Sequence, residues 1–201
     1  MKRTYFTSVF TQESVTNMPE CEQLEVDTQE MPSITEEGRE KKLLKLKISK
    51  SPGPDGIHPR ILKELSSSIK LPLKILFNHS LEKEELATEW KQANVTPLHK
   101  KRSRKKVNNY RPISLTCILC KVLESIIRDT VVNHMDLNNL WYSDQHGFLQ
   151  GRSCLTQLLQ VLEDWTSSLE RGNEVTSVFL DFAKAFDSVP HKRLLKKLGR
   201  Y

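Results

Sequence analysis

Apolar residues recur at helical spacing through much of the chain, with intervals of three and four residues that place them on one face of a helix. The clearest case is the stretch 117–135, where eight apolar residues keep this spacing. A capping-box sequence at 33–36 precedes another apolar stretch and marks a helix start. We expect helices over about 34–48, 58–68, 71–86, 117–135, 153–170 and 184–198.

Three other stretches have the short, β-rich pattern of strands, at about 93–98, 110–115 and 175–182. A loop separates the first two predicted helices, because Ser51-Pro52-Gly53-Pro54-Asp55-Gly56 holds two prolines and two glycines in six residues. The pattern therefore predicts a helix-rich α+β chain.

Charge is distributed unevenly along the 201 residues. The net charge is +6, but residues 1–40 carry three bases against nine acids, whereas the remainder carries 28 bases against 16 acids. The acidic segment 1–40 is rich in Thr, Gln, Glu and Pro and lacks periodicity, which predicts a flexible linker. The basic remainder, 41–201, indicates a polyanionic partner.

Composition also excludes several classes of protein. No apolar run approaches the roughly 20 residues that span a bilayer, so no membrane partner is expected. The basic start Met1-Lys2-Arg3 lacks a following apolar region, so we expect no secretory signal and reduced cysteines. Cys117 and Cys120 have zinc-like spacing but lie in an apolar helical pattern without a matching pair, so we expect buried thiols.

The most informative motif is Phe179-Leu180-Asp181-Phe182-Ala183-Lys184-Ala185-Phe186-Asp187. A strand that ends in a carboxylate is suited to a hard divalent cation, because Mg²⁺ prefers oxygen ligands. Nucleotidyl transfer at two metals requires further carboxylates, and a second aspartate pair is not found downstream of this motif. On this motif alone, a strand end at Asp181 and a core position for Phe186 remain an alternative.

Three further motifs precede it in order: Ser51-Pro52-Gly53-Pro54-Asp55-Gly56-Ile57, Asn109-Tyr110-Arg111-Pro112-Ile113-Ser114-Leu115, and Gln145-His146-Gly147-Phe148 followed by Gly151-Arg152-Ser153. Together with the motif at 179–187, this arrangement resembles the reverse transcriptases of non-LTR, LINE-type or jockey-like retrotransposons. The resemblance extends over about 42–198. It implies a partial right-hand polymerase fold, with fingers and the start of the palm, and a small antiparallel sheet.

The resemblance also implies site residues in the fingers. Lys100 and Arg111 would reach the incoming deoxynucleoside triphosphate, where an ammonium and a bidentate guanidinium offset its charge. The neighbouring bases would contact the backbone of the RNA template; they are Lys101, Arg102, Arg104, Lys105 and Lys106. Without that context, such a run is usually a solvated loop.

In the palm, the resemblance implies that Asp181 binds both metal ions and that the carbonyl of Phe182 binds one of them. Phe186 would lie beneath the sugar as a steric gate that rejects the 2′-hydroxyl. Ser153 is expected to cap a helix, and Arg152 beside that helix start could bind nucleic-acid phosphate. The complete enzyme would use Mg²⁺ to extend a DNA primer on an RNA template.

The sequence lacks the Y-x-D-D motif that supplies the remaining aspartates of such enzymes. We therefore expect 41–201 to be a truncated reverse transcriptase domain that is inactive alone. Two alternatives remain: a non-catalytic basic module that binds RNA or DNA, and a non-functional, unstable fragment with an open sheet edge. An aspartyl-phosphate phosphatase is disfavoured, because position 183 is Ala where that pattern has a second Asp.

Overall fold

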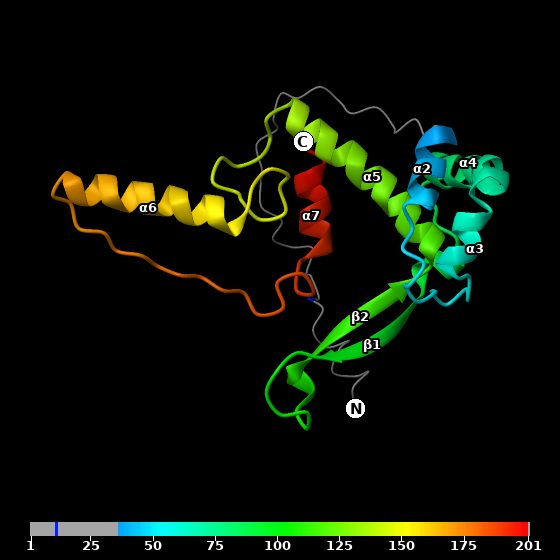
Figure 1. The fold of residues 1–201 in the computed structure, drawn as a ribbon, viewed down its shortest axis with the longest axis horizontal. Helices are drawn as coiled ribbons and strands as arrows, with labels where there is room; N and C mark the ends of the chain where they lie inside the picture. The colour runs from blue at the N-terminus through cyan, green and yellow to red at the C-terminus, as the bar shows by residue number, and fades with distance from the viewer. Residues whose placement is uncertain (1–10, 12–35, 201) are drawn as a thin grey trace. The chain divides into compact units, whose positions relative to one another are not determined.

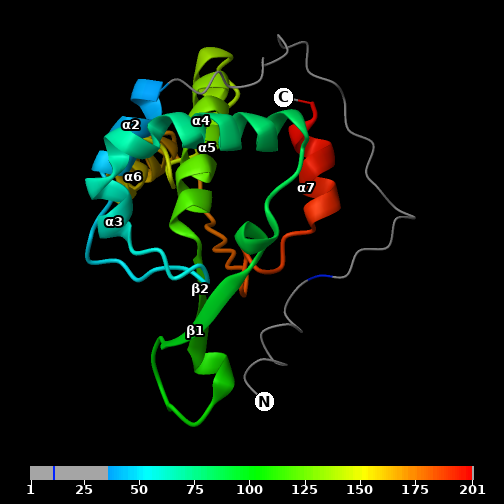
Figure 2. The ribbon, with the colours of Figure 1, turned by 90° about the vertical axis from the view of Figure 1, so that its right-hand side faces the viewer.

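The structure, a computed structural model, describes residue 11 and residues 36–200. The chain divides into two compact units, whose described parts are residues 36–134 and residue 11 together with residues 135–200. Figure 1 and Figure 2 show the helices and strands of both units. The predicted linker at 1–40 and the capping box at 33–36 lie largely outside the described residues.

The first unit packs helices around a single apolar core. Its helices are α2 (Glu36–Leu44), α3 (Pro59–Glu64), α4 (Ser66–Glu82) and most of α5 (Ile118–Leu137). The core residues are Leu43, Leu62, Leu73, Phe77, Trp90, Cys117, Ile118, Cys120, Val122 and Leu123. Phe77 and Trp90 meet edge to face at 5.7 Å between ring centroids, so α4 is joined to the 3₁₀ turn Thr88–Lys91 that leads into the sheet.

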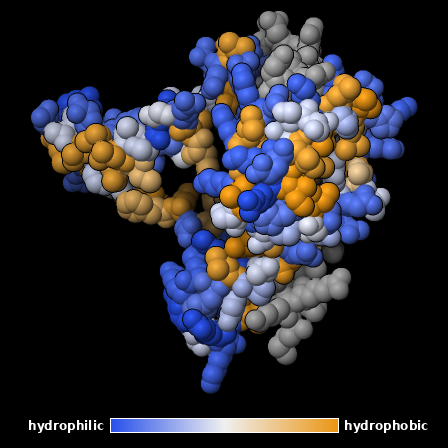
Figure 3. Space-filling model, turned by 45° about the vertical axis from the view of Figure 1, so that its right-hand side comes forward, coloured by the Kyte–Doolittle hydropathy of each residue, from blue (hydrophilic) through white to orange (hydrophobic). Residues whose placement is uncertain are grey.

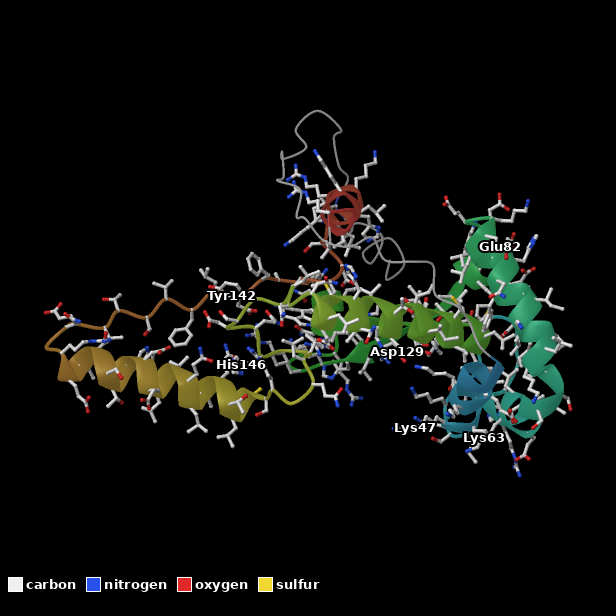
Figure 4. All side chains as sticks on the ribbon, turned by 90° about the horizontal axis from the view of Figure 1, so that it is seen from above. Lys47, Lys63, Glu82, Asp129, Tyr142 and His146 are labelled. Carbon is white, nitrogen blue, oxygen red and sulfur yellow. The ribbon has the colours of Figure 1, made fainter. Side chains whose placement is uncertain are left out.

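An ion pair links the first and last helices of this unit. The Lys42 ammonium on α2 donates to the Asp129 carboxylate and, at 3.4 Å, to the Ser125 carbonyl of α5. Figure 4 labels Asp129 on α5. Burial alone would raise the pKa of Asp129, but hydrogen bonds from Lys42 and Arg128 outweigh it and lower the pKa. The contact therefore holds α2 against α5 with a charged carboxylate.

The sheet of the described residues is a two-stranded antiparallel hairpin of β1 (Ala93–His99) and β2 (Tyr110–Thr116). Lys100 N–H donates to Asn109 O at 2.9 Å, so these residues form a hydrogen-bonded pair. Because such pairs alternate along an antiparallel ladder, the partners Pro97 and Pro112 fall in a non-hydrogen-bonded pair. The prolines therefore cost the ladder no hydrogen bond. Because proline has no N–H, they also leave each outer edge of the hairpin without a free donor at these positions.

The predicted rigid loop at 51–56 packs directly beneath this hairpin. Gly53 is buried, and a Cβ placed on it would lie 2.6 Å from both Cα and N of Cys117. Gly53 O accepts from Gly56 N–H at 3.1 Å, and Gly56 has φ +68, which favours glycine. The loop thus joins the start of α3 to the point where β2 gives way to α5.

The six elements predicted in the first unit are confirmed with shifted ends, but the boundary between two of its helices is wrong. The break expected near 69–70 lies at Leu65, whose N–H donates to Ile61 O at 3.0 Å. From Ser66, α4 continues through Pro72. An internal proline removes one helical hydrogen bond, but Leu73 and Phe77 bury their side chains on this helix and hold it in place.

The second unit contains α6 (Cys154–Glu170) and α7 (His191–Leu198). The strand predicted at 175–182 is wrong, since residues 173–182 have no regular secondary structure. A strand needs a hydrogen-bonded partner. Within the described residues the sheet consists of β1 and β2 alone, so the stretch 175–182 is not paired with another strand. The helix predicted from 184 begins only at His191, after Pro190 as N-cap; residues 183–188 form a turn.

Candidate active site

The basic loop, residues 100–109, is a folded cap on the hairpin. Side chains of three residues bind carbonyls of the loop: His99 Nε2 lies 3.1 Å from Arg102 O, Tyr110 Oη donates to Arg104 O at 2.9 Å, and Asn109 Nδ2 donates to Ser103 O at 2.8 Å. The rings of His99 and Tyr110 meet edge to face at 5.3 Å. These contacts fix the loop backbone, two of them from the strand ends His99 and Tyr110 and one from Asn109 within the loop.

The basic side chains of this loop all lie exposed to solvent; they are Lys100, Lys101, Arg102, Arg104, Lys105 and Lys106. Figure 3 shows hydrophilic residues covering the end of the hairpin. Arg102 has φ 67, the left-handed region that turns the chain sharply. The loop is therefore a fixed cationic surface suited to phosphate groups.

The hairpin register brings Lys100 and Arg111 to one face. Arg111 is paired with Leu98, and Lys100 is bonded to Asn109. Since paired residues share a face and alternate residues of a strand return to it, Lys100 and Arg111 are diagonal neighbours across the strands. Diagonal neighbours lie about 7–8 Å apart, which is within reach of two long side chains directed at one anion. Both are exposed.

Arg152 lies in the second unit and holds the loop that precedes α6. Its guanidinium donates to the carbonyl of Ser143 and, at 2.9 Å, to that of Gln145. Ser153 caps α6 as predicted, in a reciprocal capping box with Thr156. The guanidinium and the capping side chain are thus engaged with the protein itself, so a contact of Arg152 with nucleic acid would use its remaining donors.

A polar network around His146, which the sequence analysis missed, ties the same loop to α6. The His146 side chain is 9% exposed. Its ring nitrogens lie 2.9 Å from Thr156 Oγ1 and 2.9 Å from Gln160 Oε1, and Gln160 Nε2 donates to Asp144 Oδ1 at 3.1 Å. Figure 4 shows His146 close to α6. The one available signal was the four-residue spacing of Thr156 and Gln160, which puts both on one helix face.

Asp181, Phe182 and Phe186 lie between α6 and α7 in the second unit. Asp181 is exposed, and the side chains of Phe182 and Phe186 are 77% and 78% exposed. Phe186 lies in the turn 183–188, which is closed by Ser188 N–H donating to Lys184 O at 3.0 Å. Its ring meets that of Phe148 edge to face, with centroids 5.9 Å apart and planes at 87°.

The described residues do not by themselves form a metal centre. No group of three or more His, Cys, Asp or Glu side chains placed to hold a metal occurs among residue 11 and residues 36–200. Mg²⁺ demands near-octahedral oxygen coordination. Asp181 and the Phe182 carbonyl alone would not complete such a coordination sphere.

Cys117 and Cys120 are buried thiols, as predicted. Cys117 is 0% exposed and Cys120 is 4% exposed, and their sulfurs donate to the carbonyls of Glu89 and Trp90. Burial raises the pKa of Cys117, and burial together with the Glu124 carboxylate raises the pKa of Cys120 to about 12. Both thiols are therefore protonated at neutral pH.

In the part of the chain that the structure describes, no helix has the combination of length and apolarity needed to cross a bilayer.

The chain is similar to polymerases of insect mobile elements. It is 30% identical over 156 residues to "Probable RNA-directed DNA polymerase from transposon BS" of Drosophila melanogaster, with 77% of this chain and 17% of the relative covered. Over 151 residues it is 30% identical to "Probable RNA-directed DNA polymerase from transposon X-element", with 75% and 17% covered. Over 171 residues it is 29% identical to "RNA-directed DNA polymerase from mobile element jockey", with 85% and 19% covered.

The chain thus spans less than a fifth of the length of these relatives. The family model described as "Reverse transcriptase (RNA-dependent DNA polymerase)" matches residues 99–201, which include the basic loop, Arg111, Arg152 and the motif at 179–187. The resemblance found in the motifs is confirmed, and the chain belongs to the reverse transcriptase (RNA-dependent DNA polymerase) family.

Proposed function

We propose that this chain forms the fingers and the first palm motif of an RNA-directed DNA polymerase from a non-LTR mobile element. The observation that carries the proposal is the hairpin register, which puts Lys100 and Arg111 on one exposed face beside a fixed cationic loop. Residues 41–201 are then the polymerase part of the chain, and 1–40 is a linker.

In the fingers, Lys100 and Arg111 bind the incoming deoxynucleoside triphosphate. The planar guanidinium of Arg111 can engage two phosphate oxygens at once, and the Lys100 ammonium adds a point charge. The five bases at 101–106 bind the phosphates of the RNA template or DNA primer, which is a salt-dependent interaction without sequence preference. Arg152 adds a contact to nucleic acid next to the start of α6.

In the palm, Asp181 and the Phe182 carbonyl would hold Mg²⁺ once further carboxylates join them, and the ion would stabilise the charge that develops in phosphoryl transfer. Because the described residues supply only part of this donor set, the 201-residue chain should not extend a primer by itself. Phe186 would exclude the ribose 2′-hydroxyl by overlap with its ring.

Steady-state kinetics of a chimera test the nucleotide site. The chimera joins this chain to the part of a relative, such as the jockey protein, that follows the region matched by this chain. Arg111→Ala should raise KM for deoxynucleotides at least about tenfold, the loss expected for one charge-assisted bond of about 1.5–3 kcal/mol, with little change in primer-template affinity. Arg128→Ala on α5, which removes another exposed guanidinium, is the matched control. An effect of Arg111→Ala on template affinity alone would contradict the assignment.

Filter binding over a salt series tests the cationic loop in the 201-residue chain. Neutralising the six bases of the loop should remove most binding to single-stranded RNA, whereas neutralising six exposed bases elsewhere, Lys45, Lys47, Lys50, Arg60, Lys83 and Lys91, should remove much less. Equal losses would contradict a specific role for the loop. Salt-dependent binding combined with an inactive chimera would favour the non-catalytic binding module.

A further inference from the structure

Phe148 combines two features that are unusual for a phenylalanine. Its side chain is 94% exposed, and its φ is 65, in the left-handed region that large L residues rarely adopt. A glycine, Gly147, precedes it, yet the left-handed conformation falls on the phenylalanine. Such strain persists only where the surrounding structure imposes it, and it is concentrated at functional positions.

The loop around Phe148 is held by polar contacts that do not involve its ring. Gln145 Nε2 donates to Gly147 O at 2.9 Å, and Arg152 binds the carbonyls of Ser143 and Gln145. On the other side, Arg152 N–H donates to Leu149 O at 3.4 Å. The backbone conformation is therefore set by the loop, and its result is to direct the Phe148 ring outward.

The ring of Phe148 contacts the ring of Phe186. The two rings are almost perpendicular, at 87°, and their centroids are 5.9 Å apart, which is the favourable edge-to-face arrangement. Phe186 lies in a turn and is 78% exposed, so core packing does not fix its side-chain rotamer. Phe148 restricts the rotation of a ring that is otherwise free to leave its position.

A steric gate rejects a ribose only if its ring cannot turn away from the 2′-hydroxyl. We infer that Phe148 is a positioning residue for the gate: its ring holds Phe186 in place and thereby sets the discrimination between deoxy- and ribonucleotides. The inference rests on the proposed gate function of Phe186, and it assigns a specificity role to the loop before α6.

The first test measures the contact in the 201-residue chain without reference to activity. A 4-fluorophenylalanine at position 186 reports ring packing through its ¹⁹F chemical shift. Phe148→Ala should move this signal toward the random-coil position and narrow it, and Phe148→Tyr should preserve it. Tyr142→Ala, which removes another exposed aromatic ring of the same unit, should leave the signal unchanged. No shift on Phe148→Ala would overturn the contact.

The second test measures discrimination in the active chimera, as the ratio of kcat/KM for a deoxynucleotide to that for the matching ribonucleotide. Phe148→Ala should lower this ratio by about two- to tenfold, the factor that corresponds to one edge-to-face aromatic contact. Phe148→Tyr should restore it, and Tyr142→Ala should not change it. With Phe186→Val already present, Phe148→Ala should have no further effect.

The outcomes separate this inference from the proposed function. If Phe186→Val relaxes discrimination but Phe148→Ala does not, the gate stands and the role of Phe148 is refuted. If Phe186→Val leaves discrimination unchanged, the gate itself is refuted together with the inference that rests on it.

Discussion

Gly53→Ala should destabilise the first unit strongly, because the added methyl group has no space. A Cβ at this position would lie 2.6 Å from Cα and N of Cys117 and 2.7 Å from C of Thr116. All three are backbone atoms at the junction of β2 and α5, so no flexible side chain can move aside. Insertion of atoms into a packed region costs about 1–3 kcal/mol, and the backbone contacts place this case near about 3 kcal/mol.

Gly56→Ala is the matched control in the same loop. A Cβ on Gly56 meets no atom within 4 Å, but the residue has φ +68. Alanine there is strained without a clash, at about 1–2 kcal/mol. The expected order of stability is therefore wild type, then Gly56→Ala, then Gly53→Ala.

Urea unfolding followed by Trp90 fluorescence measures these differences. Trp90 is 8% exposed and belongs to the core of the first unit. The measurement needs Trp141→Phe and Trp165→Phe in all variants, so that Trp90 alone reports. A midpoint for Gly53→Ala at or above that of Gly56→Ala would refute the close packing of the loop under the hairpin.

Two further predictions concern ionisable groups of the first unit. Because the folded-state pKa of Asp129 is lowered from its ordinary value of 3.8, its contribution to stability is present above that pH and lost as the pH falls through the folded pKa. Asp129→Asn should therefore destabilise the chain at pH 7, by less than about 1 kcal/mol because the pair is partly exposed. In urea titrations the difference from wild type should vanish once the pH has fallen below the folded-state pKa of Asp129. Iodoacetamide at pH 7.5 should modify the exposed Cys154 before the buried Cys117 and Cys120. Mass spectrometry of the native chain measures the order of modification. Early modification of Cys120 would contradict its raised pKa.

The sequence predicted the elements that have strong local signals. The period of α5 and the β-type residues of the hairpin are intrinsic to those stretches, and the structure confirms both. Ser153 as helix cap is likewise a local decision, made by one side chain and the N–H of Thr156. Such features need no knowledge of distant residues.

Features that depend on distant residues were missed or wrong. The stretch 175–182 has strand-forming residues, but a strand exists only with a partner. The two contacts of Arg152 with the carbonyls of Ser143 and Gln145 were missed, because they depend on how the loop folds back on itself. The His146 network joins residues that are 10 and 14 positions apart, and the four-residue spacing of Thr156 and Gln160 does not by itself identify His146 as their partner.

Two apolar surfaces of the second unit are exposed, and one of them contains the proposed metal ligand Asp181. The first is on α6, where Leu155, Leu158, Leu159 and Leu162 are 56–66% exposed; Figure 3 shows apolar residues along this helix. The second is the stretch that leads to Asp181, where Val178, Phe179, Leu180 and Phe182 are 77–88% exposed. Apolar surface of this extent is typical of regions that another element covers.

Pairing of 175–182 with a further strand would change both the stability of this stretch and the chemistry of Asp181. Alternate residues of a strand point to opposite faces, so Val178, Leu180 and Phe182 would share one face, and Phe179 and Asp181 the other. A hydrogen-bonded ladder would fix the backbone that carries the Asp181 carboxylate and the Phe182 carbonyl, and the apolar face could then pack against a further element. Since a metal site requires ligands held in a fixed geometry, the strand that pairs with this stretch would, under the proposed function, also make Asp181 competent to bind a metal ion.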